Sequence, residues 1–232
     1  MELEGKVALV TGAAGGIGTA LVDALDHSGA RVVGVDLDDG DITDPAAVEE
    51  IVRRTETEHG ALDILVNNAG GYETPIFPDA PLEHWSRTLD LNLRAVLLGI
   101  HFAVPALERR GGGAIVNVAS SAGLGFGAYE GAPEYAAAKA GVVRLTACLV
   151  SLLERRIRVN CVCPHTVATP AVVNAIATAE REGSELPQAL RDEPLQLGEV
   201  TEAVLRLLAD ESLAGRVLVL RGGEEPRLLT AA

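Results

Sequence analysis

The sequence lacks the features that mark a protein for a membrane, for secretion or for nucleic acid. No uninterrupted apolar run approaches the roughly 18 to 20 residues of a membrane-spanning helix, and residues 1–4 are acidic where a secretion signal is basic. No cluster of lysine and arginine stands out, and the 232-residue chain carries a net charge of −14. Because such a surface repels phosphate groups on average, nucleic acid and anionic membranes are poor partners. We expect a soluble protein of the cytoplasm.

Cysteine is also scarce. The chain has three cysteines, Cys148, Cys161 and Cys163, which is an odd number in a chain of medium size and does not resemble a disulfide framework. A reducing compartment is therefore expected. Cys161 and Cys163 form a C-x-C pattern on an expected strand, without other metal ligands nearby, so we interpret them as core residues and predict no metal site.

Short apolar runs and helical patterns alternate along the whole chain. With 48% hydrophobic residues and no break in composition, the chain predicts one domain, residues 1–232, without internal repeats. The apolar runs are typical of strands buried on both faces, and we place them at 7–10, 31–35, 62–66, 114–118, 158–162 and 216–220. Helices between parallel strands imply right-handed crossovers, so the predicted fold is a doubly wound α/β Rossmann-like sheet that binds ligands at the carboxyl ends of its strands.

Local signals mark two of the expected helices. Asp44 can cap a helix that begins at Pro45 and ends at Gly60, with an apolar stripe along one side. A second helix is predicted from about Leu82 to Arg110, and the three glycines that follow would end it.

A glycine-rich segment, Thr11-Gly-Ala-Ala-Gly-Gly-Ile-Gly18, stands directly between the first strand and a helix. Glycines permit a tight turn and a close approach of backbone N–H groups to a pyrophosphate, and a helix N-terminus adds a favourable dipole. Alone, such a cluster is equally compatible with a flexible surface loop. Its position after a strand and before a helix favours a dinucleotide site.

Asp36 ends the second strand, about 18 residues past the glycine turn. A carboxylate at this place can accept hydrogen bonds from both ribose hydroxyls of an adenosine and would repel a 2′-phosphate. Because the turn holds no arginine or lysine, the residues favour NAD over NADP. The alternative is a solvated acid at a strand end.

Taken together, these motifs resemble the short-chain dehydrogenase/reductase family. The turn has that family's T-G-x-x-x-G-x-G spacing, Asn67-Asn-Ala-Gly70 matches its N-N-A-G, and Tyr135-Ala-Ala-Ala-Lys139 matches its Y-x-x-x-K. The resemblance extends over nearly the whole chain. It implies the catalytic set Asn92, Ser120, Tyr135 and Lys139. It further implies that the cofactor is bound by Gly12, Gly16, Ile17, Gly18, Asp36, Asp41, Ile42, Asn68, Ala69, Gly70, Tyr135, Lys139, Pro164, Val167 and Thr169.

The chemistry of the Tyr-Lys pair can be argued from the residues themselves. Positions i and i+4 lie on one face of a helix, so the Lys139 ammonium can lie close to the Tyr135 phenol. A fixed positive charge lowers the cost of forming a phenolate, so Tyr135 can exchange a proton with an alcohol or a carbonyl. Ser120 would hydrogen-bond the same oxygen. By resemblance, Asn92 holds a water that links Lys139 to solvent.

Each of these residues also has a plainer interpretation. Ser120 could merely cap a turn, and Ser121 competes for its role. Asn92 alone would be an ordinary helix asparagine, and Lys139 without Tyr135 an ordinary surface lysine.

The chain departs from the family pattern in two places. Only four residues separate Asp36 from Asp41, where most members have a helix and a strand, so the sheet should lose an edge strand and the adenine pocket should be more open. His165 also stands where the family usually has a glycine. It is either a substrate contact, a second titrating group or a tolerated loop residue.

The remaining expectations concern the substrate and the assembly. Residues 170–196 should form a substrate lid, and Tyr129 is either a substrate contact or a loop aromatic. By resemblance the helices at 82–110 and 134–153 would pair between subunits, giving a homodimer or homotetramer. The predicted function is hydride transfer between NAD(H) and a small alcohol or carbonyl compound. The alternative is a non-catalytic dinucleotide-binding regulator or scaffold. A dehalogenase-like relative is disfavoured, because those carry arginine in place of Lys139.

Overall fold

A computed structural model describes the chain except residues 126–130, 187–189, 191 and 231–232. At its centre lies one seven-stranded sheet in the order β2-β1-β3-β4-β5-β6-β7. The strands are β1 (Val7–Thr11), β2 (Arg31–Val35), β3 (Ile64–Asn67), β4 (Gly113–Val118), β5 (Ile157–Pro164), β6 (Val217–Leu220) and β7 (Arg227–Leu229). The strand order reverses between β1 and β3, which is where a doubly wound sheet opens a crevice at its carboxyl edge.

The predicted parallel sheet is confirmed for β1 to β6, with one addition at the edge. Neighbouring strands pair in parallel from β2 through to β6, whereas β7 runs antiparallel to β6. The sequence analysis missed β7 because its three residues are too few to show a period. The other edge is β2, as expected for a chain that lacks the strand usually inserted after Asp36.

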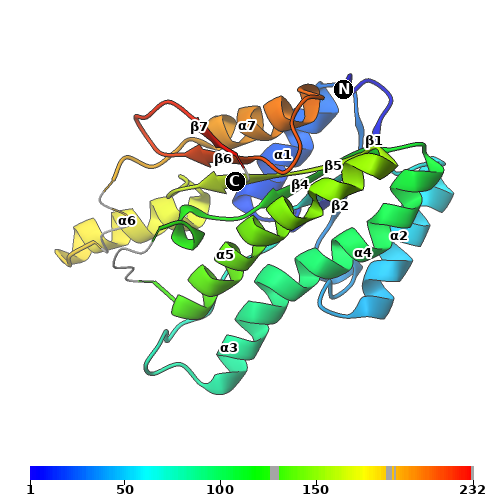
Figure 1. Ribbon diagram of the computed structural model, residues 1–232. Helices are drawn as coiled ribbons and strands as arrows, with labels where there is room; N and C mark the ends of the chain where they lie inside the picture. Colours follow the sequence, from blue (N-terminus) through cyan, green and yellow to red (C-terminus); the bar gives the residue numbers. More distant parts are fainter. Residues whose placement is uncertain (126–130, 187–189, 191, 231–232) are drawn as a thin grey trace.

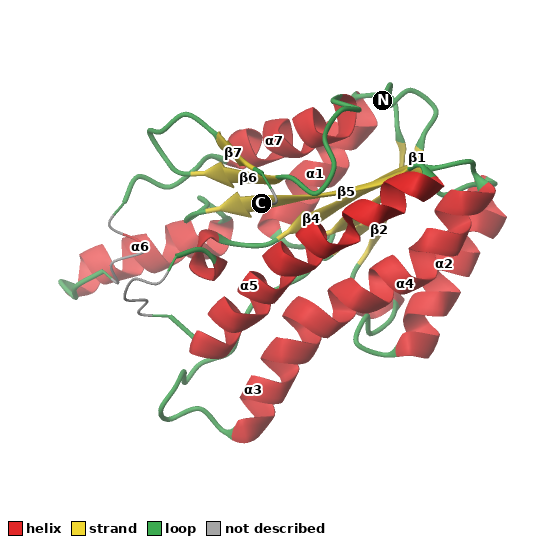
Figure 2. Cartoon of the chain, viewed as in Figure 1, coloured by secondary structure: helices red, strands yellow, loops and turns green. Residues whose placement is uncertain are grey.

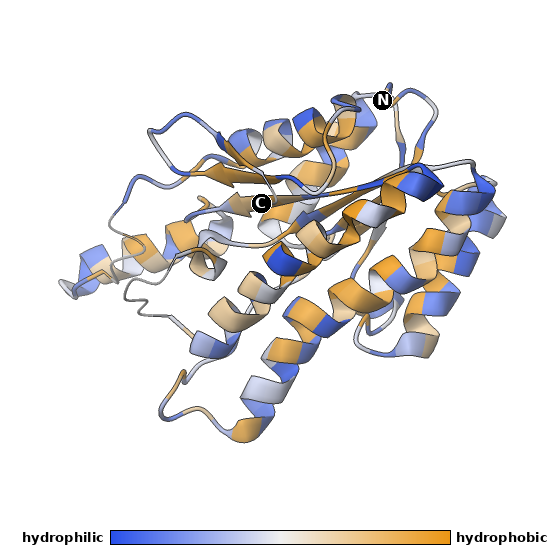
Figure 3. Ribbon diagram, in the orientation of Figure 1, coloured by the Kyte–Doolittle hydropathy of each residue, from blue (hydrophilic) through white to orange (hydrophobic). Residues whose placement is uncertain are grey.

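Helices cover both faces of the sheet (Figures 1 and 2). Their bounds are α1 (Gly16–His27), α2 (Pro45–His59), α3 (Leu82–Leu89), α4 (Ala95–Arg109), α5 (Pro133–Cys148), α6 (Pro170–Glu182) and α7 (Leu197–Ala209). Buried residues of α1 and α7 pack on one face, and those of α2, α4 and α5 on the other. Because strand side chains alternate, successive residues such as Leu9 and Val10 belong to opposite cores. In Figure 3 the strands are accordingly the most hydrophobic layer.

The helix predicted from Leu82 to Arg110 is continuous but not uniform. A π-helical turn, η2 (Asp90–Arg94), separates α3 from α4, and the Ala95 N–H bonds the carbonyl of Asp90, five residues back. The side-chain amide of Asn92 donates to the Thr88 carbonyl (2.8 Å), which an α-helix would use for a backbone bond. The prediction of one regular α-helix was therefore wrong at this turn, because a side chain competes for a backbone acceptor.

Two helical stretches are long and apolar enough to cross a membrane by length and composition. They are Leu82–Arg109 and Pro133–Arg155, the second including the 3₁₀ segment η4 (Leu149–Arg155). Polar residues interrupt both stretches, so neither stands out in the sequence as an apolar run. Residues of both stretches pack against the sheet, as core helices of globular proteins do.

Arg158 of β5 forms hydrogen bonds with the C-terminal end of α7. Its guanidinium is buried and donates to the carbonyls of Leu207, Leu208 and Asp210 at 2.8 to 3.0 Å. The carbonyls of Leu207 and Leu208 lie in the last turn of α7, where the helix itself offers no donor, and the Asp210 carbonyl accepts from the Leu213 N–H as well (3.2 Å).

We predict that Arg158→Met lowers the free energy of unfolding by about 3 kcal/mol, because several buried carbonyls lose a charged donor. Urea denaturation measures this. The control is Arg31→Met on the edge strand β2, where the arginine is exposed and a change below about 0.5 kcal/mol is expected. Equal effects of the two substitutions would contradict the assigned role of Arg158.

Candidate active site

The glycine turn between β1 and α1 is closely packed against the loop after β3. Gly12 has a φ of +67°, and a Cβ on it would lie 2.7 Å from the Cα of Ala69. A Cβ on Gly18 would lie only 1.9 Å from the carbonyl oxygen of Gly12. No other residue type fits at these two positions without displacing the backbone. The turn therefore needs its glycines for shape as well as for the approach of a ligand.

Thr11 and Asn68 tie this turn to the end of β3. The Thr11 hydroxyl accepts from the backbone N–H groups of Asn68 (3.1 Å) and Ala69 (3.2 Å). The Asn68 side-chain amide donates to the carbonyls of Thr11 (3.0 Å) and Gly12 (3.1 Å). The predicted T-G and N-N-A-G motifs, 57 residues apart, thus form one hydrogen-bonded unit.

The N-terminus of α1 faces the same space. No side chain caps the helix at Gly15, and its first turn holds no acidic residue. These first N–H groups have no partner within the helix, and the helix dipole favours an anion beside them.

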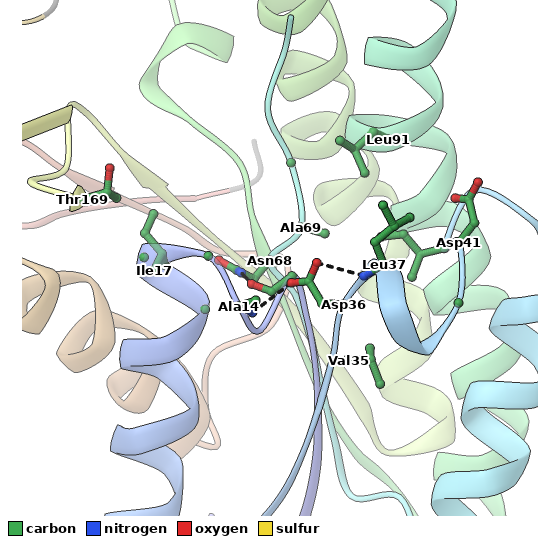
Figure 4. A pocket seen from close by; sticks show the side chains of 17 residues that line it. Ala14, Ile17, Val35, Asp36, Leu37, Asp41, Asn68, Ala69, Leu91 and Thr169 are labelled. Carbon is green, nitrogen blue, oxygen red and sulfur yellow. Dashed lines mark hydrogen bonds between the residues drawn. The ribbon is translucent and has the colours of Figure 1, made fainter. Parts of the chain in front are cut away.

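Asp36 closes the turn from the side of β2 (Figure 4). Its carboxylate accepts from the backbone N–H of Ala14 (2.9 Å) and of Leu37 (2.9 Å). A carboxylate has about four acceptor positions, and the capping box with Asp39 uses a further one, so acceptor capacity remains for a hydroxyl group of a ligand. The plainer interpretation, a solvated acid at a strand end, does not account for the bond to the glycine turn.

These elements enclose a cavity of about 600 Å³. Eleven predicted cofactor residues line it, namely Gly12, Gly16, Ile17, Gly18, Asp36, Asp41, Ile42, Asn68, Ala69, Gly70 and Thr169, the last of which lies at the far end of the cavity. Sequence reasoning missed Ala14, Gly15, Val35, Leu37, Gly40 and Leu91, which also line it. The first five lie within two residues of predicted ones in the chain. Leu91 comes from the π turn, whose geometry no sequence pattern indicated.

Four other predicted cofactor residues lie outside the lining of this cavity. Pro164 ends the buried strand β5, and Val167 is buried and bridges to Leu195. Tyr135 and Lys139 lie on α5, near the ends of β3 and β4. Their cofactor contacts remain predictions.

The structure brings Ser120, and not Ser121, to Tyr135. Ser120 follows β4 in an extended conformation and hydrogen-bonds the tyrosine side chain, whereas Ser121 turns to His165. Burial raises the pKa of Tyr135, and the bond to Ser120 only partly opposes this. We expected the nearby ammonium to favour the phenolate. Desolvation by burial sets the direction of the shift instead, so the phenol is protonated at neutral pH and can donate a proton.

Lys139 lies one helical turn beyond Tyr135, as the i, i+4 spacing predicts. Its Nζ donates to the carbonyl of Val118 (2.9 Å) and lies 5.6 Å from the centroid of the Tyr135 ring. The side chain is only 2% exposed. Burial lowers the pKa of Lys139 from 10.5 to about 8, so the amine is still mostly charged at neutral pH.

Asn92 and Gly70 complete the group around the lysine. A Cβ on Gly70 would lie 2.9 Å from Lys139 Nζ and 2.6 Å from Asn92 Oδ1, so both polar groups lie against this glycine. Asn92 is fully buried, accepts from the Gly71 N–H (3.0 Å) and donates to the Gly71 carbonyl (2.6 Å). The interpretation as an ordinary helix asparagine is therefore wrong. Its amide joins the π turn to the loop after β3.

Comparison with known proteins identifies the family to which these motifs belong. The family model described as short chain dehydrogenase matches residues 35–180. The 3-oxoacyl-(acyl-carrier-protein) reductase of Thermotoga maritima is 32% identical, with 96% of this chain and 99% of the relative covered. The chain belongs to the short-chain dehydrogenase/reductase family.

Other relatives of this short-chain dehydrogenase are similar over nearly their whole length. The trans-4-hydroxycyclohexanecarboxylate dehydrogenase of Sinomonas cyclohexanicum is 36% identical, with 94% of this chain and 92% of the relative covered. The solved structure of the aldohexose dehydrogenase of Thermoplasma acidophilum has a TM-score of 0.82 at 28% identity, with 95% of this chain and 94% of that one covered. The names of these relatives give no support to a non-catalytic scaffold.

Tyr72 is a candidate site residue that the sequence analysis missed. Its ring centroid lies 5.2 Å from that of Tyr135, and the residue is 44% exposed. The position just after the N-N-A-G motif was the available signal. Tyr129, by contrast, lies outside the described residues.

We predict that Lys139→Met inactivates the protein yet raises its thermal midpoint at pH 7. A pKa of about 8 in place of 10.5 means that burying the charge costs about 3 kcal/mol, whereas losing the bond to Val118 costs about 1 kcal/mol. The unfolded chain holds this proton more tightly between pH 8 and 10.5, so the wild type regains stability over that range. Thermal melts at pH 7 and pH 10 measure the difference, which should shrink at the higher pH. A variant less stable than wild type at pH 7 would contradict the prediction.

Proposed function

We propose that this short-chain dehydrogenase transfers a hydride between a nicotinamide dinucleotide and a small alcohol or carbonyl substrate. The observation that carries the proposal is the group formed by Ser120, Tyr135 and Lys139 beside the glycine-lined cavity. The cavity fits a dinucleotide, because it combines a helix N-terminus without a cap, glycines that leave room for close approach and a carboxylate with free acceptor positions.

In this proposal each residue has one task. The bound nicotinamide supplies or receives the hydride. Tyr135 gives its phenolic proton to the substrate oxygen during reduction and takes it back during oxidation. Ser120 hydrogen-bonds that oxygen and stabilises the charge that develops on it. Lys139 contributes a fixed positive charge beside the phenol, and Asn92 holds the loop at Gly71 against which the lysine lies.

The proposed cofactor preference is NAD, and it is supported by charge. Asp36 and Asp41 line the cavity, and no lysine or arginine is found among its described lining residues. A 2′-phosphate would therefore lie near carboxylates without a compensating cation.

Residues 170–196 are proposed to cover the substrate. Figure 1 shows α6, which forms the first half of this segment, beyond the carboxyl ends of β5 and β6. Thr169 caps α6 through a bond from the Val172 N–H (3.3 Å) and also lines the dinucleotide cavity. The segment is thus attached next to the expected nicotinamide position.

A homodimer or homotetramer formed through the long helices is proposed as the assembly. Leu82, Leu89 and Leu97 on α3 and α4 are 40 to 72% exposed, and Val150 and Leu153 after α5 are 43 and 46% exposed. Figure 3 shows hydrophobic residues along the visible sides of α4 and α5. Exposed apolar stripes of this kind mark protein contact surfaces. We place this assembly in the cytoplasm, which agrees with three unpaired cysteines.

Tyr135→Phe should lower kcat by at least about 100-fold, since it removes the group that exchanges the proton. The affinity for NADH, measured by fluorescence titration, should stay within about twofold, because the phenyl ring preserves the packing. A panel of alcohols and ketones provides the assay, and Tyr72→Phe is the control that removes a neighbouring hydroxyl. If Tyr135→Phe kept more than a tenth of the wild-type rate, the proposed mechanism would fail.

Asp36→Asn should reduce the preference for NADH over NADPH by about tenfold, the value of a hydrogen bond to a charged group. Thermal shift and titration with both cofactors measure the preference. Asp38→Asn is the matched control, because it removes the same charge from an exposed neighbour that does not line the cavity. A wild type that binds NADPH more tightly than NADH would refute the proposed cofactor.

A further inference from the structure

A second set of polar side chains lies behind the catalytic serine. His165 follows β5 directly, and both of its ring nitrogens are engaged. The Ser121 Oγ lies 2.7 Å from Nδ1, and Asp192 Oδ2 lies 3.1 Å from Nε2. The imidazole therefore connects the turn after β4 with the segment that precedes α7.

The chemistry of the three groups orders their protons. An ionised carboxylate only accepts hydrogen bonds, so the nitrogen that faces Asp192 must carry a hydrogen. In the neutral ring the other nitrogen, Nδ1, is then an acceptor, and the Ser121 hydroxyl must donate to it. The directions of both hydrogen bonds, from His165 to Asp192 and from Ser121 to His165, thus follow from a single tautomer of the imidazole.

The serine at the end of this series adjoins the catalytic residue. Ser121 begins the short turn η3 (Ser121–Gly123), which is capped by the Ser120 hydroxyl through the Ala122 N–H (3.1 Å). A Cβ on Gly123 would lie 2.5 Å from the Ala140 nitrogen, so the turn packs directly on α5 beside Lys139. An interaction that fixes the position of Ser121 therefore also fixes the position of Ser120 relative to Tyr135.

The other end of the series is anchored near the cofactor cavity. Three residues after Asp192, Leu195 exchanges backbone hydrogen bonds with Thr166 and Ala168, each of 2.8 Å. Thr169, which follows directly, lines the cavity. His165 therefore lies between the segment next to the cofactor and the serine next to the substrate.

We propose that His165 is a positioning residue, which fixes the catalytic turn at Ser120 through the hydrogen-bond relay Asp192–His165–Ser121. This inference rests on the proposed function. In the relay, Asp192 selects the His165 tautomer, the imidazole orients the Ser121 hydroxyl, and Ser121 sets the place of its neighbour. His165 itself does not need to touch the substrate, and its side chain is only 22% exposed.

The tautomer can be tested without any turnover. Nitrogen-15 NMR of the full-length protein at pH 8 resolves the rings of its five histidines, and His165→Asn identifies the signal of His165. We expect a neutral ring protonated on Nε2, and we expect Asp192→Asn and Ser121→Ala each to shift that signal. A ring protonated on Nδ1, or a signal that neither variant moves, would overturn the relay.

A double-mutant cycle tests its effect on catalysis. Ser121→Ala and Asp192→Asn do not remove contacting groups, so without a relay their effects on kcat/KM should add. We expect each to lower kcat by about threefold to tenfold with unchanged affinity for NADH, and the double variant to be no slower than the slower single variant.

Glu193→Gln removes the same charge next to Asp192 and serves as the control, with unchanged kcat expected. Additive effects, or a loss confined to NADH affinity, would reject the inference. Should the wild type turn over no alcohol or ketone, the proposed function would fail, whereas the NMR result would still decide whether the relay exists.

Discussion

The burial of one ammonium group next to a phenol is the constraint on which the site depends. Lys139 Nζ has little contact with water and donates to the Val118 carbonyl at the end of β4. Such a charge is costly to bury, and a lowered pKa is the visible sign of that cost. The buried Lys139 ammonium is held in place because the parallel sheet brings the ends of β3 and β4 together next to α5. A site that is locally unfavourable is thus held by a core on each face of the sheet.

The same edge of the sheet explains why residues far apart in the chain act together. Thr11 ends β1, Asn68 directly follows β3, Ser120 follows β4, and His165 follows β5. Because the strands are parallel, all of these residues lie at one edge of the sheet. The backbone hydrogen bonds between strands end there, and hydrogen bonds of side chains replace them. Polar bonds across this edge, from Thr11 to Asn68 and from Ser121 to His165, hold loops that the sheet itself does not.

Much of this arrangement could be predicted from the residues. The six parallel strands, the cap at Asp44, the glycine turn and the Tyr-Lys pair were all confirmed as structural features, because each depends on a local period or a short fixed spacing. The π turn, the edge strand β7 and the contact of Tyr72 with Tyr135 were not foreseen. The π turn depends on Asn92 competing for the Thr88 carbonyl, and β7 depends on the free edge of β6. The contact of Tyr72 depends on the path of the loop after β3.

The sequence by itself determined the class of fold, the family and the chemical groups available for proton transfer, since these follow from residue types at short separations. Only the tertiary structure decided which serine meets Tyr135, in which direction burial shifts the pKa of that phenol, and which partners His165 has. These are matters of distance and desolvation between segments tens of residues apart. No local pattern encodes them, because the free energy that sets them is released only when the two cores close around the sheet.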